Sequence, residues 1–203
     1  TVLSGATLTA APGVTLDVAS PGVVRVQCGG RVDASNLGFA GGTVAHPAGF
    51  APAGVAASQL DSGGSHGGAG SVGDIPNPVG ATFDSVVWPG EGGGGGARGS
   101  RTDTTSNLGG SGGGVVRLDA AELVLDGTLA SRGQDFLAEA TTTLRRDRPA
   151  GAGGAITVVA GRLAGKGTID ASGGDTLADI STAQAGAGGG GRVALHVGTL
   201  DRF

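Results

Sequence analysis

The sequence predicts an all-β fold, namely a parallel β-helix (β-solenoid) with long Gly-rich loop excursions. The main observation is a unit of very short strands at residues 112–133, which is copied at 153–173 and begins again at Gly190. Gly supplies 45 of the 203 residues without the every-third spacing of collagen, and aromatic residues make up only 3%. Apolar positions that recur in each unit while the linking loops vary are typical of a solenoid, and no helical periodicity is present.

Residues 1–34 are expected to form short strands joined by tight corners. Leu16 and Val18 alternate with other residues, so they share one face of a strand. Pro21–Gly22 predicts a turn, and a second short strand follows around Val24. No helical segment separates these strands, which agrees with an all-β chain.

Residues 35–112 are interpreted as a large Gly/Pro-rich insertion within a single domain that spans residues 1–203. Structureless loops of this length are uncommon in compact domains. Four of the chain's six aromatic residues nevertheless lie here, namely Phe39, Phe50, Phe83 and Trp88. Their concentration favours an ordered excursion over one face of the core, in which runs such as Gly92–Gly96 adopt an extended, polyproline-II-like geometry.

The repeated units can be aligned residue by residue. Gly114, Gly154 and Gly191 begin matching units, 40 and then 37 residues apart. Matching positions are apolar in every unit, so their side chains are expected to point inward and stack about 4.8 Å apart. The expected stacking residues of the core are Val116, Leu118, Leu123, Leu129, Ile156, Val158, Leu163, Ile169, Val193 and Leu195. Residues 30–35 match residues 167–172 in four of six places, which places the N-terminal segment in the same series.

Two carboxylates occupy matching positions in this alignment. Asp33 and Asp170 would lie two strand spacings apart, roughly 9–10 Å, with Ala130 between them. That separation is near the upper limit for the acid and base of an inverting glycosidase. An Asp in this position also bonds backbone amides of its own turn, and no Arg or Lys recurs beside it as a substrate clamp. We therefore expect no enzyme and no catalytic residue, with the carbohydrate-active pair as the alternative.

Trp88 and His66 are the candidate binding residues. Trp88 is the only Trp and could serve as an aromatic platform for a glycan. His66 lies between glycines, where it can reach a ligand or pin a loop by bonding a backbone carbonyl. His196 is expected to face solvent, on the strand face opposite Val193 and Leu195.

Composition and spacing limit the classes of partner and cofactor. The net charge of −4, with scattered basic residues, gives no reason to expect nucleic acid. No apolar run approaches 18 residues, so no membrane span is expected. The histidines lack HxH or HxxxH spacing, and the only cysteine, Cys28, is expected to be a small buried hydrophobe. We expect no metal and no cofactor.

The repeat pattern GG-G-(V/I)-x-(L/V)-x-A-x-x-L-x-G-x-G-x-(I/L)-x-A-x-G resembles glycine-rich repeats of very large secreted and cell-surface proteins of myxobacteria, related bacteria and some protists. The segment SGGSHGGAG…PGEGGGGG is similar to the Gly-His-Gly-Gly loop that accompanies such repeats. The resemblance covers most of the chain and carries over no catalytic residue. It implies a β-helical, extracellular, adhesin-like structural module.

These observations together predict a non-catalytic extracellular structural module, a β-solenoid building block of a cell-surface fibre, filament or adhesin. The alternatives are a carbohydrate-active β-helix, like a polysaccharide lyase or glycosidase, and a glycan-binding module. The expected partners are further copies of the chain, or neighbouring repeats stacked end to end, with cell-surface glycans as a second class. The expected location is extracellular or at the cell surface.

Overall fold

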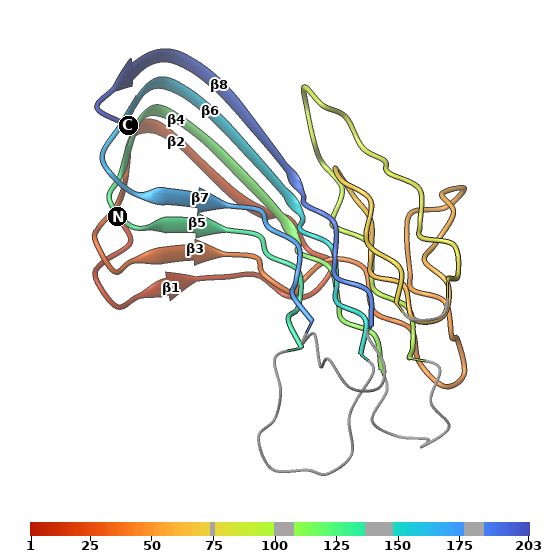
Figure 1. Cartoon of the computed structure of the whole chain (residues 1–203). Coiled ribbons are helices and arrows are strands. Elements are labelled where there is room, and N and C mark those ends of the chain that lie inside the picture. Colours follow the sequence, from red (N-terminus) through yellow and green to blue (C-terminus); the bar gives the residue numbers. More distant parts are fainter. Residues whose placement is uncertain (74–75, 100–107, 137–147, 177–184) are drawn as a thin grey trace.

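The computed structural model describes residues 1–203 except 74–75, 100–107, 137–147 and 177–184, and the described part contains two parallel sheets and no helix (Figure 1). In order across the first sheet, sheet A, the strands are β2 (Leu16–Val26), β4 (Val115–Leu125), β6 (Ala155–Ala164) and β8 (Arg192–Asp201). In order across the second sheet, sheet B, they are β1 (Thr7–Leu8), β3 (Arg31–Asp33), β5 (Thr128–Ala130) and β7 (Thr168–Asp170). Sheet A arches over sheet B in Figure 1.

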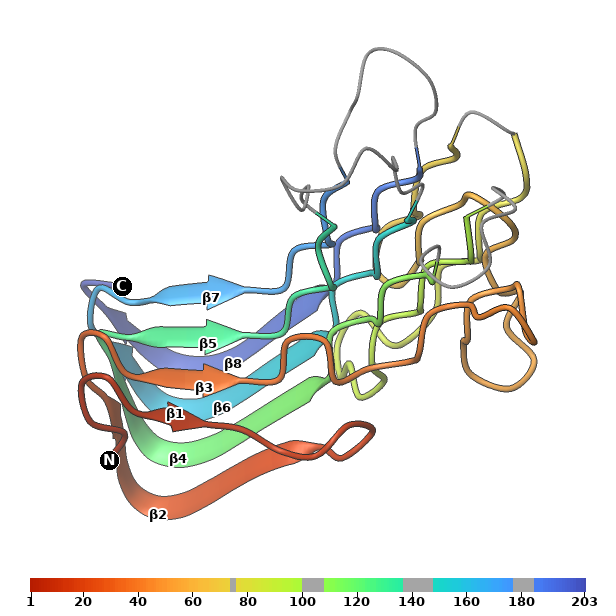
Figure 2. The ribbon, with the colours of Figure 1, turned by 90° about the horizontal axis from the view of Figure 1, so that it is seen from below.

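The prediction of a parallel β-helix (β-solenoid) is wrong. The strands of sheet B are only two or three residues long, and the two four-stranded sheets are separate and do not coil. After sheet B the chain enters Gly-rich segments, whose described residues contain no strand, and only then returns to sheet A (Figure 2). What the structure shows is an all-β chain with two parallel sheets, because the Gly-rich segments bond to one another instead of forming a further sheet.

The register derived from the repeat is confirmed by the ladder of sheet A. Val116 pairs with Ile156, and Ile156 pairs with Val193, as the spacing of 40 and then 37 residues requires. Sheet B follows the same rule, because Leu129 pairs with Ile169. A shift by one residue would turn every apolar side chain to the other face, so the hydrophobic pattern fixes this register.

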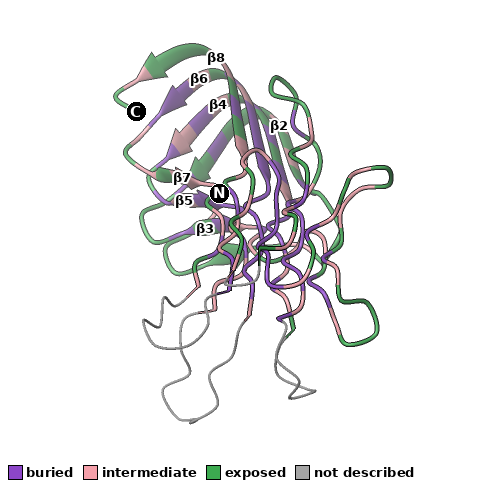
Figure 3. Ribbon diagram, turned by 45° about the vertical axis from the view of Figure 1, so that its right-hand side comes forward, coloured by how far each residue is buried: buried purple, intermediate pink, exposed green. Residues whose placement is uncertain are grey.

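The core lies between the inner faces of the two sheets. Ile169 is partly buried there, and the following expected core residues are fully buried: Val116, Leu118, Leu123, Leu129, Ile156, Val158 and Leu163. Val193 and Leu195 are 45% and 42% exposed, although they share rows with the buried Ile156 and Val158. The expected burial of these two residues is not observed, because β8 is an edge strand and no other strand of the described ranges covers it (Figure 3).

Two expectations about the N-terminal segment also need correction. Pro21–Gly22 does not form a turn between two strands, because β2 continues through it with a shift of register against β4. Such a bulge bends an edge strand, and edge strands tolerate Pro because one side of their backbone has no partner. Cys28 is exposed at the corner after β2 and is not part of the core.

The Gly-rich part of the molecule is held together by backbone hydrogen bonds between segments that are distant in sequence. The Gly95 amide donates to the Phe50 carbonyl at 2.9 Å, and the Ala152 amide, in the segment that enters β6, donates to the Gly94 carbonyl at 2.9 Å. The described part of the 35–112 insertion is therefore tied directly to the segments that enter sheet A. These segments run beside one another at the ends of the two sheets (Figure 2).

Glycine is required here because the backbones approach too closely for a side chain. A Cβ built on Gly95 would lie 1.9 Å from the carbonyl oxygen of Ala40, and one on Gly63 would lie 1.9 Å from that of Ala187. Real Cβ atoms do not come so close, and the obstacle is another backbone that is itself hydrogen-bonded. Most glycines of this part face a similar neighbour, whereas Gly190 has open space around its Cβ position.

Substitution of Gly95 by Ala should therefore destabilise the fold much more than the same change at Gly190. Overpacking typically costs about 1–3 kcal/mol, and a backbone obstacle places Gly95→Ala at the upper end of that range. Gly190→Ala should change the free energy of unfolding by less than about 0.5 kcal/mol. Urea unfolding followed by far-UV circular dichroism measures both. Equal stability of the two variants would contradict the close backbone packing.

Candidate functional site

The structure brings Asp33 and Asp170 to the positions that the repeat predicts. Asp33 pairs with Ala130 in the ladder of sheet B, and Ala130 pairs with Asp170. Each carboxylate, however, accepts a 2.9 Å hydrogen bond from a backbone amide in its own turn, that of Ser35 or Ser172. This geometry supports a structural role for both carboxylates.

Asp33 is also held in its charged form. Burial acts to raise the pKa of Asp33, but hydrogen bonds from Ser35 and Arg31 together with the charge of Arg31 outweigh it, so the pKa lies below its usual value. A carboxyl of this kind is a poor proton donor near neutral pH, whereas a glycosidase needs one carboxyl with a raised pKa. Asp33 is therefore unsuited to act as the general acid of such a pair.

His66 is completely buried in the Gly-rich part. Its Nδ1 lies 2.9 Å from the carbonyl oxygen of Gly153, and its Nε2 lies 3.1 Å from Oδ2 of Asp84. The Phe83 ring packs against the imidazole with the two centroids 4.9 Å apart. Each ring nitrogen therefore has an oxygen acceptor within hydrogen-bond distance. The contacts give His66 a loop-pinning role, and no face of the ring is open to a ligand.

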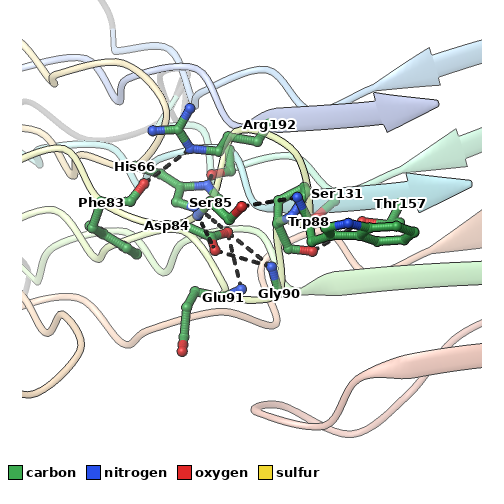
Figure 4. Close-up of polar contacts among 12 residues, drawn as sticks. His66, Phe83, Asp84, Ser85, Trp88, Gly90, Glu91, Ser131, Thr157 and Arg192 are labelled. Atoms are coloured by element: carbon green, nitrogen blue, oxygen red, sulfur yellow. Dashed lines mark hydrogen bonds and ion pairs between the residues drawn. The ribbon is translucent and has the colours of Figure 1, made fainter. Parts of the chain in front are cut away.

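Asp84 fastens the loop of residues 84–91, hereafter the Trp88 loop. Its carboxylate accepts hydrogen bonds from the amides of Ser85, Gly90 and Glu91, so it ties the two ends of the loop together (Figure 4). Burial acts to raise the pKa of Asp84, but these amides and His66 outweigh it and keep the pKa below its usual value. Asp84 has a left-handed backbone with φ of 76°, which Asp tolerates better than most residues.

The Trp88 loop is docked on the outer face of sheet A. The Thr157 hydroxyl donates to the Pro89 carbonyl at 3.0 Å, and Nε2 of His196 lies 2.8 Å from the Val87 carbonyl. The Trp88 ring stacks on His196 at 3.8 Å between centroids and 13° between planes. His196 therefore does lie on the face opposite Val193 and Leu195, but it supports the loop and is not simply solvated.

One side of Trp88 remains accessible. The residue is 53% exposed, and the adjacent Val86 and Val87 are more exposed still. The loop thus presents a short apolar tip whose aromatic ring is fixed by the stack on His196. A ring that is already fixed in orientation loses little entropy when a flat apolar surface, such as a sugar face, stacks on it.

The free edge of sheet A is a second accessible feature. Along β8, the side chains of Val193, Leu195 and Leu200 are 45%, 42% and 62% exposed. They belong to the same rows as fully buried residues of β4 and β6. The edge therefore presents apolar side chains of a ten-residue strand whose outer side has no neighbouring strand among the described residues.

The remaining features of the described residues offer little chemistry. A cavity of about 180 Å³ lies beside Phe39, and among its lining residues Glu91 alone carries a charge. Within the described ranges, no group of three or more His, Cys, Asp or Glu side chains is arranged to hold a metal ion. The same ranges contain no helix long and apolar enough to span a membrane.

No protein-family model, no curated protein and no solved structure matches this chain. Functional inference therefore depends on the two accessible features, the tip of the Trp88 loop and the edge of β8.

Sequence reasoning missed the partners of its own candidate residues. Asp84 lies in a Gly/Pro-rich stretch without periodicity, so no pattern connects it to His66. The stack of Trp88 on His196 joins residues 108 positions apart, outside any repeat. The cross-strand ion pair of Arg162 with Glu122, in contrast, could have been predicted from the repeat, because the spacing of 40 residues places the two side by side.

Replacement of Asp84 by Asn should release the Trp88 loop while preserving the shape and the tolerated backbone of the residue. Loss of charged hydrogen bonds should cost about 1–3 kcal/mol of unfolding free energy at neutral pH. Because the folded pKa of Asp84 lies below 3.8, its stabilisation is present above that value and is lost as the pH falls through the folded pKa. The stability difference from the parent protein should therefore shrink in acid.

Fluorescence of Trp88, the only Trp, gives a local readout of the loop in the same samples. Asp119→Asn, at an exposed position of β4, is the matched control and should leave both stability and fluorescence unchanged. A stability difference between Asp84→Asn and the parent protein that did not shrink as the pH was lowered below 3.8 would contradict the role of the Asp84 charge.

Proposed function

We propose that this chain is a non-catalytic structural module of an extracellular or cell-surface assembly, which associates through the edges of its parallel sheets. The observation that carries the proposal is the accessible edge of β8, with its apolar rows exposed. Monomeric proteins normally protect a long edge strand with charges, Pro or a covering segment, because an open edge pairs with other strands. β8 has no Pro, and its inner face carries apolar side chains.

The apolar rows give this edge a substantial capacity for association. Complete burial of a Val or Leu side chain is worth about 1.5–3 kcal/mol, and three such side chains are about half exposed on β8. Covering them would contribute roughly 2–4 kcal/mol, in addition to the backbone hydrogen bonds of a new ladder. A further strand laid along β8 is therefore favoured.

The rest of the molecule supports a structural role by holding this edge rigid. The entry to β8 is fixed by a hydrogen bond from Arg192 to the Phe83 carbonyl, and its far end is fixed by an ion pair between Asp201 and Arg162. The same Arg162 pairs with Glu122 on β4, so the charges join three strands. The hydrogen bond to Asp201, together with the charges of both carboxylates, raises the pKa of Arg162 above its usual value.

Leu195→Lys should weaken association of the protein at least tenfold, because a charged side chain would face the new junction. Sedimentation velocity over a range of concentrations, with electron microscopy of the most concentrated samples, measures the effect. Val44→Lys, at an exposed site of the Gly-rich part, is the control and should associate like the parent protein. A parent protein that stays monomeric at all concentrations would contradict the proposal.

A second candidate function is passive glycan binding at the tip of the Trp88 loop. It is favoured by the half-exposed Trp88 ring, which His196 holds in place. If this candidate holds, Trp88→Ala should abolish binding on a glycan array and Trp88→Phe should retain part of it, whereas Val44→Lys should leave it intact. Binding that survives Trp88→Ala would exclude Trp88 as the platform.

A further inference from the structure

The two sheets are staggered by one strand. Three units each consist of a strand of sheet A and the strand of sheet B that follows it: β2 with β3, β4 with β5, and β6 with β7. At one end β8 extends sheet A beyond β6, and at the opposite end β1 extends sheet B beyond β3. The molecule therefore presents two half-units of opposite kind, one with only a strand of sheet A and one with only a strand of sheet B.

We propose that a second copy of the same chain completes these half-units by parallel, head-to-tail association. In the junction, β8 of one copy pairs with β2 of the next, and β7 of the first copy pairs with β1 of the next. One β8 and one β1 then form a unit like the three within each molecule. This inference rests on the proposed function, because it names the partner, the polarity and the register of the sheet edges described there.

The apolar rows continue across this junction without interruption. Within one molecule the ladder aligns Leu16, Val116, Ile156 and Val193, so the next position in the row belongs to Leu16 of the second copy. The other apolar rows place Val18 of the second copy beside Leu195, Val24 beside Leu200, and Leu8 beside Ile169. The side chains exposed on β8 thus meet apolar side chains of β2, and the half-exposed Leu8 meets the partly buried Ile169.

Charges on the outer face are complementary in the same register. The ladder aligns Arg25 with Val124, Val124 with Ala164, and Ala164 with Asp201. Arg25 of the second copy would therefore lie beside Asp201, which already pairs with Arg162. The ion-pair network from Glu122 through Arg162 to Asp201 would gain a further cation, and so acidic and basic groups would alternate across the junction.

Two local features have to fit the junction. The bulge at Pro21–Gly22 divides the edge of β2, so its ladder with β8 forms as two arms on either side of the bend. Val2 pairs with Val26 at the outer edge of β2. In the junction, Val2 of the second copy would therefore occupy the position beside Val26 that the register otherwise gives to Arg202 of the first copy. Arg202 is exposed and its φ of 56° already turns the chain out of the strand, which allows residues 202–203 to move aside.

Mixing of two end-blocked variants tests the head-to-tail arrangement. Leu195→Lys blocks the end formed by β8, and Leu8→Lys blocks the end formed by β1. All proteins carry Cys28→Ser, because that cysteine is exposed and could form disulfides. Each variant alone should be monomeric in sedimentation velocity, and their equimolar mixture should form a one-to-one dimer and nothing larger. Leu8→Lys that still self-associates would indicate pairing of two β8 edges, and it would overturn the proposal while leaving the proposed function intact.

A cross-link gives a second measurement that does not depend on blocking an end. Thr7 and Thr168 occupy one row at opposite ends of sheet B, so they become neighbours only across the junction. A chain with Thr7→Cys and Thr168→Cys should form covalent multimers on mild oxidation, within the Cα separation that disulfides allow. Thr7→Cys with Thr128→Cys is the control and should stay monomeric, because Thr128 lies on an inner strand. Equal cross-linking of the two pairs would overturn the register, and a parent protein that never associates would instead count against the proposed function.

Discussion

Close contact between backbones is the constraint on which the rest of this structure depends. In the Gly-rich part, neighbouring segments approach so closely that a Cβ on Gly95 or Gly63 would collide with a carbonyl group. Side chains are excluded at these positions, and hydrogen bonds between backbones hold the segments together there. The high content of glycine is a consequence of this constraint.

The two sheets and the Gly-rich part have different structural roles. The sheets supply the apolar core, in which Leu118 and Leu123 are fully buried. The Gly-rich segments lie at the sheet ends and hold His66, whose contact with Asp84 sets the position of the Trp88 loop. The accessible features, an aromatic tip and an apolar strand edge, are thus held in place by hydrogen-bonded surroundings, which suits the proposed role in assembly.

The sequence by itself determined the strand register and the rows of the core. This was possible because a parallel ladder repeats one local pattern: the 40-residue spacing between Val116 and Ile156 is also their pairing in space. Its solenoid interpretation was wrong, because the repeat reports which strands are neighbours and not whether the chain closes around them. The position of Asp33 relative to Asp170 followed from the repeat as well, whereas their hydrogen bonds within the turns depend on local geometry.

Only the tertiary structure decided which parts of those rows are covered and what the insertion does. Val193 has the same sequence pattern as Ile156 but remains exposed, since burial depends on a neighbouring strand that no local pattern encodes. His66 contacts Asp84, and Trp88 stacks on His196, although the Gly-rich sequence around His66 and Trp88 has no periodicity that would pair them. Long-range contacts of this kind arise from backbone packing in three dimensions, and a repeat-based alignment contains no information about them.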